Sequence, residues 1–165
     1  MREHMWDEDA GCFLAVRRDS LEKIHNPTVG SFTPLMAQVP TADQAAHMAE
    51  TLGNSGWNTP LPVPTVSRND KSFVSDGFWR GDVWPAPVYQ VATGLAHYNI
   101  LNLTAKLAGA NIGNAIRVGM SEHYDSLSGK PLGVSGLGMS AVVLTMALDG
   151  LSPTHRISVA STSSS

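Results

Sequence analysis

The chain has 165 residues, of which 42% are hydrophobic and 15% charged, and its formal net charge is −3. This length and composition are typical of one globular domain with a substantial core. The eleven basic residues are scattered and outnumbered by fourteen acidic ones, which argues against a nucleic-acid partner. The longest apolar run, over 140–148, is far too short to cross a bilayer, so no membrane partner is expected.

The first residues, the cysteine and histidine content and one glycine-rich stretch bear on the location of the protein and on its cofactors. The first residues contain no apolar segment of the kind found in secretory signals, so a cytoplasmic location is expected. The single Cys12 cannot form an internal disulfide, and the six histidines lack paired metal-ligand spacing. The stretch GVSGLG has its glycines in the wrong order for a dinucleotide loop. We therefore expect neither a metal nor a redox cofactor.

The clearest predicted helix covers 41–53. Thr41 can act as its N-cap, and Gly53 suits the position after its last turn. From 53 to 82 the chain is rich in proline, asparagine and aspartate, and no helix can run through its alternating prolines, Pro60, Pro62 and Pro64. We expect about thirty residues of extended loop there, a length that indicates a functional loop or a neighbouring element.

Two further helices are predicted after this loop. Pro85 suits a first helical turn, and apolar residues then fall on one face at Val88, Val91, Leu95 and Tyr98. After a break near Asn99, a second helix is indicated by the spacing of Leu103, Leu107, Ile112 and Ile116. Glycines within this second segment weaken the helical pattern.

The last part of the chain is predicted to be a loop, a closing helix and a tail. The loop covers 121–133, and the helix over 136–151 is apolar on nearly all sides, so burial on most sides is expected. The segment 152–165 is a Ser-rich tail. The predicted fold class is all-α, with a globular part over 1–151 whose long Pro- and Gly-rich loops carry the chemistry at one end.

Five stretches of the chain resemble, in order, the motifs of one enzyme group. They are MWDEDAGCF, FTPLMAQVPTADQAAHMAETL, PLPVPTVSRNDKSF, FWRGDVWP, and EHYDSLSGKPLG followed by GLGMSAVVL. The group is that of the (α/α)6 six-hairpin glycosidases, in the branch of the mannosylglycerate and glucosylglycerate hydrolases and the related family 63 glucosidases. The resemblance covers about 5–151 and implies the C-terminal part of such a domain, a partial (α/α)6 toroid.

The resemblance also implies a reaction and a set of site residues. The reaction is inverting hydrolysis of an α-glucoside or α-mannoside, and the substrate is a small carbohydrate or glycoside. The glutamate of the Glu-x-Tyr-Asp motif, here Glu122, corresponds to the general base. The substrate-binding residues expected from the motifs are Phe78, Trp79, Arg80, Trp84, Tyr89 and Tyr124.

The second carboxylate of the reaction is less clear. The family's general acid belongs to an upstream Gly-Trp-Asp-Asn-Ser-Pro-like motif that this chain does not contain. Asp82 lies in the FWRGDVWP stretch over 78–85, called the aromatic loop below, and is a candidate acid, although relatives often have proline at this position. An inverting site needs both carboxyl groups. The isolated chain is therefore expected to be inactive, with the N-terminal part of the toroid as its missing partner.

Other interpretations of the same residues remain open. The tryptophans suit a protein core, Glu122 suits a solvated loop, and Arg80 suits a structural ion pair with Asp82. The alternatives to a glycoside hydrolase fragment are a non-catalytic helical sugar-binding or interaction module, and a truncated gene product without a function.

Overall fold

A computed structural model of the chain describes residues 1–152, and it is rich in helix. The α-helices are α1 (Arg2–Met5), α2 (Ala42–Gly53), α3 (Pro85–His97), α4 (Leu101–Val118) and α5 (Val142–Leu148). The 3-10 turns are η1 (Val29–Ser31), η2 (Thr33–Leu35) and η3 (Gly138–Ala141). The strands are β1 (Trp6–Asp7), β2 (Cys12–Phe13), β3 (Ser121–Tyr124) and β4 (Pro131–Ser135). The predicted Ser-rich tail lies, apart from Ser152, outside the described residues.

Helix α2 begins where its sequence predicts. Gln44 N donates to the Thr41 hydroxyl at 3.2 Å, and Thr41 N donates to the Gln44 side chain at 3.0 Å, which makes a capping box. The end of the helix differs from the prediction by one residue. Gly53 is the last helical residue, and the chain leaves the helix at Asn54 in an extended conformation.

Helix α3 confirms the predicted start at Pro85 and the predicted buried face. Val88, Val91 and Leu95 are fully buried, and the chain turns at Asn99 with a φ of 59°. In α4 the prediction fails for the last turn, where Ile116 is 74% exposed. Ile116 follows Leu107 by nine residues, which places it half a turn away around the helix.

The loop predicted over 121–133 is wrong, because β3 and β4 form an antiparallel hairpin there. The strands are too short to show an alternating pattern, and Pro131 and Gly133 are poor strand formers. The closing helix is also shorter and less buried than predicted. Residues of α5 that face α3 and α4 are buried, while Leu144 and Leu148 on its other side are exposed.

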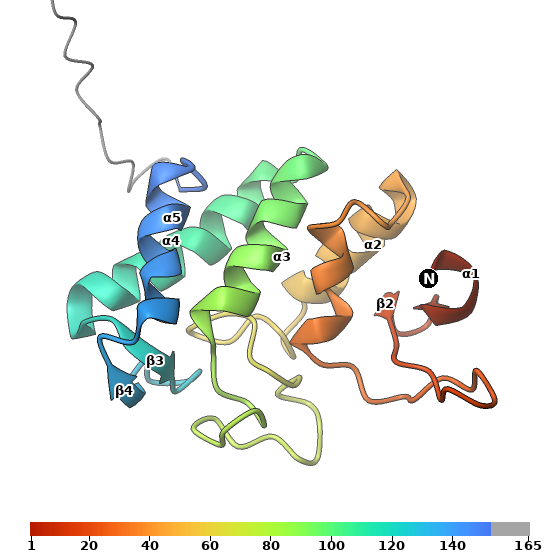
Figure 1. Ribbon diagram of the computed structural model, residues 1–165, viewed down its shortest axis with the longest axis horizontal. Coiled ribbons are helices and arrows are strands. Elements are labelled where there is room, and N and C mark those ends of the chain that lie inside the picture. Colours follow the sequence, from red (N-terminus) through yellow and green to blue (C-terminus); the bar gives the residue numbers. More distant parts are fainter. Residues whose placement is uncertain (153–165) are drawn as a thin grey trace, which may run out of the picture.

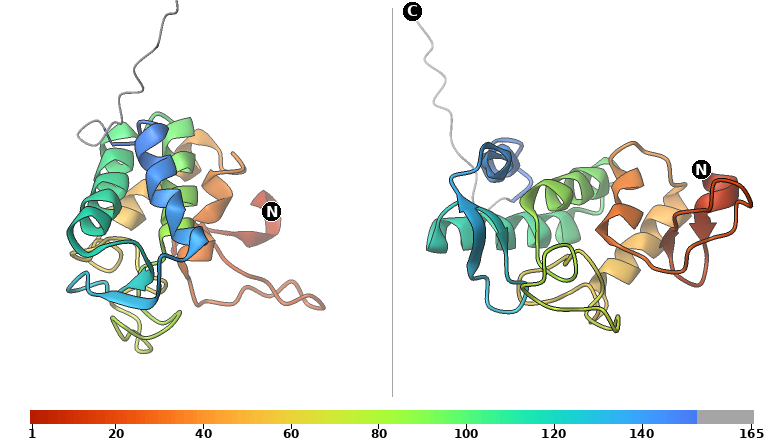
Figure 2. Two further views of the ribbon diagram at one scale, coloured as in Figure 1. Left: turned by 60° about the vertical axis from the view of Figure 1, so that its left-hand side comes forward. Right: turned by 60° about the horizontal axis from the view of Figure 1, so that its bottom comes forward.

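The helices lie side by side, with α3 in the middle of the core between η2, α4 and α5 (Figure 1). The segment between α2 and α3 and the β3–β4 hairpin lie together at one end of these helices (Figures 1 and 2). Val83 and Tyr124 join them, since each main-chain N–H donates to the other residue's carbonyl at 2.8 and 2.9 Å. Within residues 1–152, no helix has the length and apolar character of a membrane span.

The packing of α3 against η2 leaves no room for a side chain at Gly94. A Cβ atom there would lie 2.4 Å from Leu35 Cβ and 2.5 Å from the Leu35 carbonyl carbon, whereas one at Gly113 in α4 would meet nothing within 4 Å. We predict that Gly113→Ala raises the free energy of unfolding by about 0.5–1 kcal/mol through helix propensity. Gly94→Ala should lower it by about 1–3 kcal/mol despite the same propensity gain. Urea denaturation of the two variants checks this, and equal effects would contradict the close contact.

Candidate active site

Four aromatic rings from the aromatic loop and the hairpin form one cluster. Trp84 stacks between Trp79, with ring centroids 4.5 Å apart and planes at 13°, and His123, at 4.8 Å and 4°. Phe78 meets Trp84 and His123 edge-on, at 5.2 and 5.5 Å. Trp84 and His123 are buried, while Phe78 and Trp79 are 60% and 46% exposed. The cluster therefore has a buried base and an exposed aromatic surface.

The carboxylate of Asp82 lies completely buried against this cluster. Its Oδ1 accepts the Thr65 hydroxyl at 2.9 Å, and its Oδ2 accepts the indole N–H of Trp84. The same Oδ2 lies 2.8 Å from Nδ1 of His123, but this contact does not have the geometry of a hydrogen bond. The close approach and the burial of both groups make it a charge contact when the imidazole is protonated.

The loop that carries Phe78 and Trp79 is held in an uncommon conformation. Trp79 has a φ of 55°, a left-handed region that bulky residues rarely adopt. Main-chain bonds from Val74 N to Arg80 O at 2.8 Å and from Arg80 N to Gly77 O at 2.6 Å close the loop. These bonds hold the Trp79 ring in a defined place at the surface.

Glu122 lies on β3, next to His123 in sequence, and is half-buried. Its Oε2 accepts the main-chain N–H of Val134 on β4 at 3.1 Å. A Cβ atom at Gly133 would lie 2.4 Å from Glu122 Oε2 and 3.0 Å from His123 Cδ2. The carboxylate and the edge of the imidazole therefore meet at this glycine, which connects Glu122 with the aromatic cluster.

The residues after Glu122 hold the hairpin in place. Tyr124 is fully buried, its hydroxyl donates to Gly119 O at 2.9 Å, and burial raises its pKa. Burial also works against the charge on Asp125, but the N–H groups of Ser128 and Leu127, both at 2.8 Å, outweigh it and keep the pKa of this carboxyl below its usual value. These partners are structural, and they favour a supporting role for Tyr124.

Two other predicted substrate-binding residues, Arg80 and Tyr89, take no part in the contacts of the four-ring cluster. Arg80 is exposed, and in the described part of the chain its guanidinium forms no ion pair with Asp82. Tyr89 is half-buried on α3, and its hydroxyl is 3.0 Å from the Asp149 carboxylate at the end of α5. That hydrogen bond is the main cause of the raised pKa of Tyr89. Their roles toward a substrate remain predictions.

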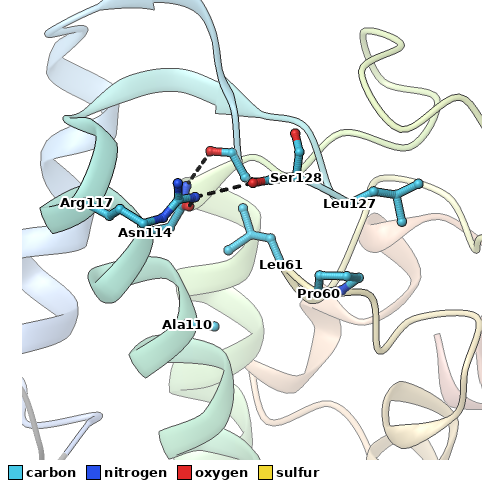
Figure 3. Close-up of a pocket in the computed structure, with 8 residues that line it drawn as sticks. Pro60, Leu61, Ala110, Asn114, Arg117, Leu127 and Ser128 are labelled. Carbon is cyan, nitrogen blue, oxygen red and sulfur yellow. Dashed lines mark hydrogen bonds between the residues drawn. The ribbon is translucent and has the colours of Figure 1, made fainter.

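A cavity of about 360 Å³ adjoins the exposed aromatic surface. It is lined by both apolar and polar residues: Trp79, Val29, Pro87, Gly30, Thr28, Thr33, Thr65 and Gln90. A second cavity, of about 300 Å³, lies between α4 and the turn over 125–129 (Figure 3). Its Arg117 donates to Asn114 Oδ1 at 2.6 Å and to Ser128 O at 3.3 Å, and no predicted site residue lines it. The cavity beside Trp79 is therefore the one connected with the predicted site.

Sequence reasoning missed Thr65 and His123. Both are polar residues inside motifs, but their partner Asp82 is distant in sequence, and only the folded loop brings the three together. Within residues 1–152, no three His, Cys, Asp or Glu side chains are grouped closely enough to hold a metal ion.

The chain thus combines a helix-rich fold with an aromatic cluster and a carboxylate at one end of the helices, and comparison with known proteins places it among the glycoside hydrolases. Residues 1–140 match the mannosylglycerate hydrolase MGH1-like glycoside hydrolase domain, and the chain belongs to this family. It is 30% identical over 141 residues to a mannosylglycerate hydrolase of Thermus thermophilus, which covers 86% of this chain and 34% of that protein. It is 26% identical over 129 residues to mannosylglycerate hydrolase MGH1 of Selaginella moellendorffii, covering 78% of this chain and 26% of that one.

Solved structures agree with this family. A GH63 mannosylglycerate hydrolase of Thermus thermophilus in complex with glucose superposes with a TM-score of 0.81 at 30% identity, over 87% of this chain and 36% of that one. Its complex with Tris and D-glycerate gives 0.80. The neutral trehalase Nth1 of Saccharomyces cerevisiae, at 20% identity and 0.68 over 91% of this chain and 30% of that one, shares the fold. The chain spans about a third or less of the length of the curated relatives it matches.

The position of Glu122 depends on the missing side chain at Gly133. Gly133 and Gly136 share a φ of 69°, but a Cβ atom at Gly136 would meet nothing within 4 Å. We predict that Gly133→Ala displaces the Glu122 carboxylate from the Val134 amide, whereas Gly136→Ala, with the same backbone strain, leaves it in place. Amide proton–nitrogen correlation spectra check this through the Val134 resonance. Equal shifts of that resonance in both variants would contradict the contact.

Proposed function

We propose that this chain forms the general-base side and the aromatic wall of an inverting α-glycosidase site. Glu122 activates the attacking water, and Phe78 and Trp79 form the exposed wall against which a sugar ring stacks. Trp84 belongs to the wall as the buried ring that supports them. In this reaction a carboxylate takes a proton from water while an opposed carboxylic acid donates to the leaving oxygen, with the two groups about 6.5–9.5 Å apart.

The observation that carries the proposal is that Glu122 borders the aromatic cluster at its buried member, His123. Its Oε2 is fixed by the Val134 amide and lies against the glycine that also borders His123. His123 stacks on one face of the Trp84 ring, and Trp79 stacks on the other face of the same ring. A base must be held in a defined place beside its substrate, and this arrangement supplies both the hold and the adjacent apolar surface.

Of the two carboxylates predicted for the site, Asp82 suits a supporting role better than that of an acid. It is completely buried and surrounded by Thr65, Trp84 and His123, whereas a proton donor must reach the leaving oxygen. We propose that the acid comes from a part of the fold that the relatives possess beyond the third of their length matched here.

The relatives also indicate a substrate class. The Thermus thermophilus structures are complexes with glucose and with Tris and D-glycerate. We propose a small α-glucoside or α-mannoside of a hydroxy acid as the substrate. The cavity beside Trp79 would then lie next to the sugar.

The function is tested by comparing the chain alone with a chimera that combines it with the remaining part of a relative. The 165-residue chain alone should not hydrolyse mannosylglycerate, because a missing acid lowers the rate by about 10²–10⁴-fold. A chimera in which residues 1–140 replace the matching segment of the Thermus thermophilus mannosylglycerate hydrolase should hydrolyse it. Glu122→Gln in this chimera should lower kcat by about 10²–10⁴-fold with little change in KM.

Glu50→Gln, at an exposed position on α2, is the matched control and should leave kcat unchanged. If the chimera has native circular dichroism and Glu122→Gln leaves its activity unchanged, the assignment of the base is contradicted. Turnover by the 165-residue chain alone would contradict the proposal that the acid lies elsewhere.

A non-catalytic sugar-binding module is a second candidate function. It is favoured by the exposure of Phe78 and Trp79, which leaves them accessible to a sugar without further parts of the fold. Binding of glucose by the 165-residue chain that depends on Trp79 but not on Glu122, together with an inactive folded chimera, would select this function.

A further inference from the structure

Among the side chains that the structure describes, the Asp82 carboxylate is the one that contacts both buried rings of the cluster through a single oxygen. Its Oδ2 accepts the Trp84 indole N–H and lies 2.8 Å from His123 Nδ1. A fully buried carboxylate is expensive unless hydrogen bonds and an opposite charge compensate it. Thr65 supplies one further hydrogen bond, and of these partners only the imidazole can take a positive charge.

The shared oxygen explains why one of its two ring contacts is not a hydrogen bond. The indole and the imidazole are parallel within 4° and 4.8 Å apart between centroids, so a single oxygen cannot lie in both ring planes. It lies where the indole N–H reaches it, and the imidazole nitrogen is left with a close contact only. This oxygen therefore holds the indole by a hydrogen bond and lies against the imidazole at the same time.

We propose that Asp82 is a positioning residue for the sugar-binding wall and for the base, a role that rests on the proposed function. Its carboxylate fixes Trp84 against His123. Trp84 in turn supports the exposed Trp79 and Phe78, and His123 borders Glu122 at Gly133. Asp82 itself touches neither the sugar nor the attacking water.

Thr65 takes part in the same positioning role, because it holds Asp82 in place. Its hydroxyl donates to Asp82 Oδ1 at 2.9 Å and accepts from Gly81 N at 2.8 Å, and its own N–H donates to Asp82 O at 2.8 Å. Thr65 therefore fixes the side chain and the main chain at Asp82. Thr65 also lines the cavity beside Trp79, so the residues that hold Asp82 border the space available to a ligand.

The test uses the 165-residue chain and two readouts. The first is the near-ultraviolet circular dichroism of the coupled Trp79–Trp84 pair, assigned by its loss in Trp79→Phe. The second is glucose affinity measured by tryptophan fluorescence. In Asp82→Ala the coupled signal should disappear and the affinity should fall by about tenfold or more, because the rings are no longer held in place. Asp82→Asn keeps an acceptor for the indole N–H and should restore most of both.

Thr65→Val, which removes only the hydroxyl, should weaken both readouts, and Thr65→Ser should restore them. If Asp82→Ala does not fold, the comparison of Thr65→Val with Thr65→Ser tests the positioning role in its place. Asp7→Asn is the control, because Asp7 is also a buried carboxylate but contacts Lys23, at 3.2 Å, and none of the four rings. It should leave the coupled signal and the affinity unchanged.

A merely structural role for Asp82 predicts a different pattern. Asp82→Ala and Thr65→Val would then lower the melting temperature, but below it both would keep the wild-type coupled signal and affinity. That result would overturn the proposal. If the wild-type chain does not bind glucose, the proposed sugar site fails, and the coupled signal still shows whether Asp82 positions the rings.

Discussion

The burial of the Asp82 carboxylate is the constraint on which the rest of this site depends. The segment between α2 and α3 contains neither helix nor strand, yet it presents two exposed aromatic rings in a defined arrangement. It can do so because Asp82 connects two distant parts of this segment through its hydrogen bond with Thr65. Asp82 also connects the segment to the hairpin through its contact with His123. The adjacent main-chain pair between Val83 and Tyr124 makes the same connection without side chains.

The helices provide the frame for this connection. Helix α3 starts at Pro85, directly after Trp84, so the buried indole is attached to the most buried helix of the core. The hairpin follows α4 and is closed by Tyr124, whose hydroxyl returns to Gly119. Loop and hairpin are thus both anchored at one end of the helices, where catalytic residues on loops are commonly found. The exposed apolar residues of α5, Leu144 and Leu148, lie on the side of this helix away from α3 and α4.

Local rules predicted the helices well and the site only in part. The capping residues of α2 and the proline start of α3 are short-range signals, and both are present in the structure. The hairpin was missed because such short strands carry too little pattern. His123 and Thr65 were missed because their roles exist only through Asp82, which is far from both along the chain. Glu122 and the aromatic wall were singled out by resemblance to a family, and the family is confirmed while their roles remain proposals.

The central claim is that the exposed rings and Glu122 form one sugar subsite. The most direct test is a crystal structure of the chain with glucose. The claim predicts a pyranose ring stacked on Trp79 or Phe78, with its anomeric carbon on the side of the Glu122 carboxylate. Glucose bound only in the cavity beside Arg117, or a wall that stays empty at saturating glucose, would contradict it.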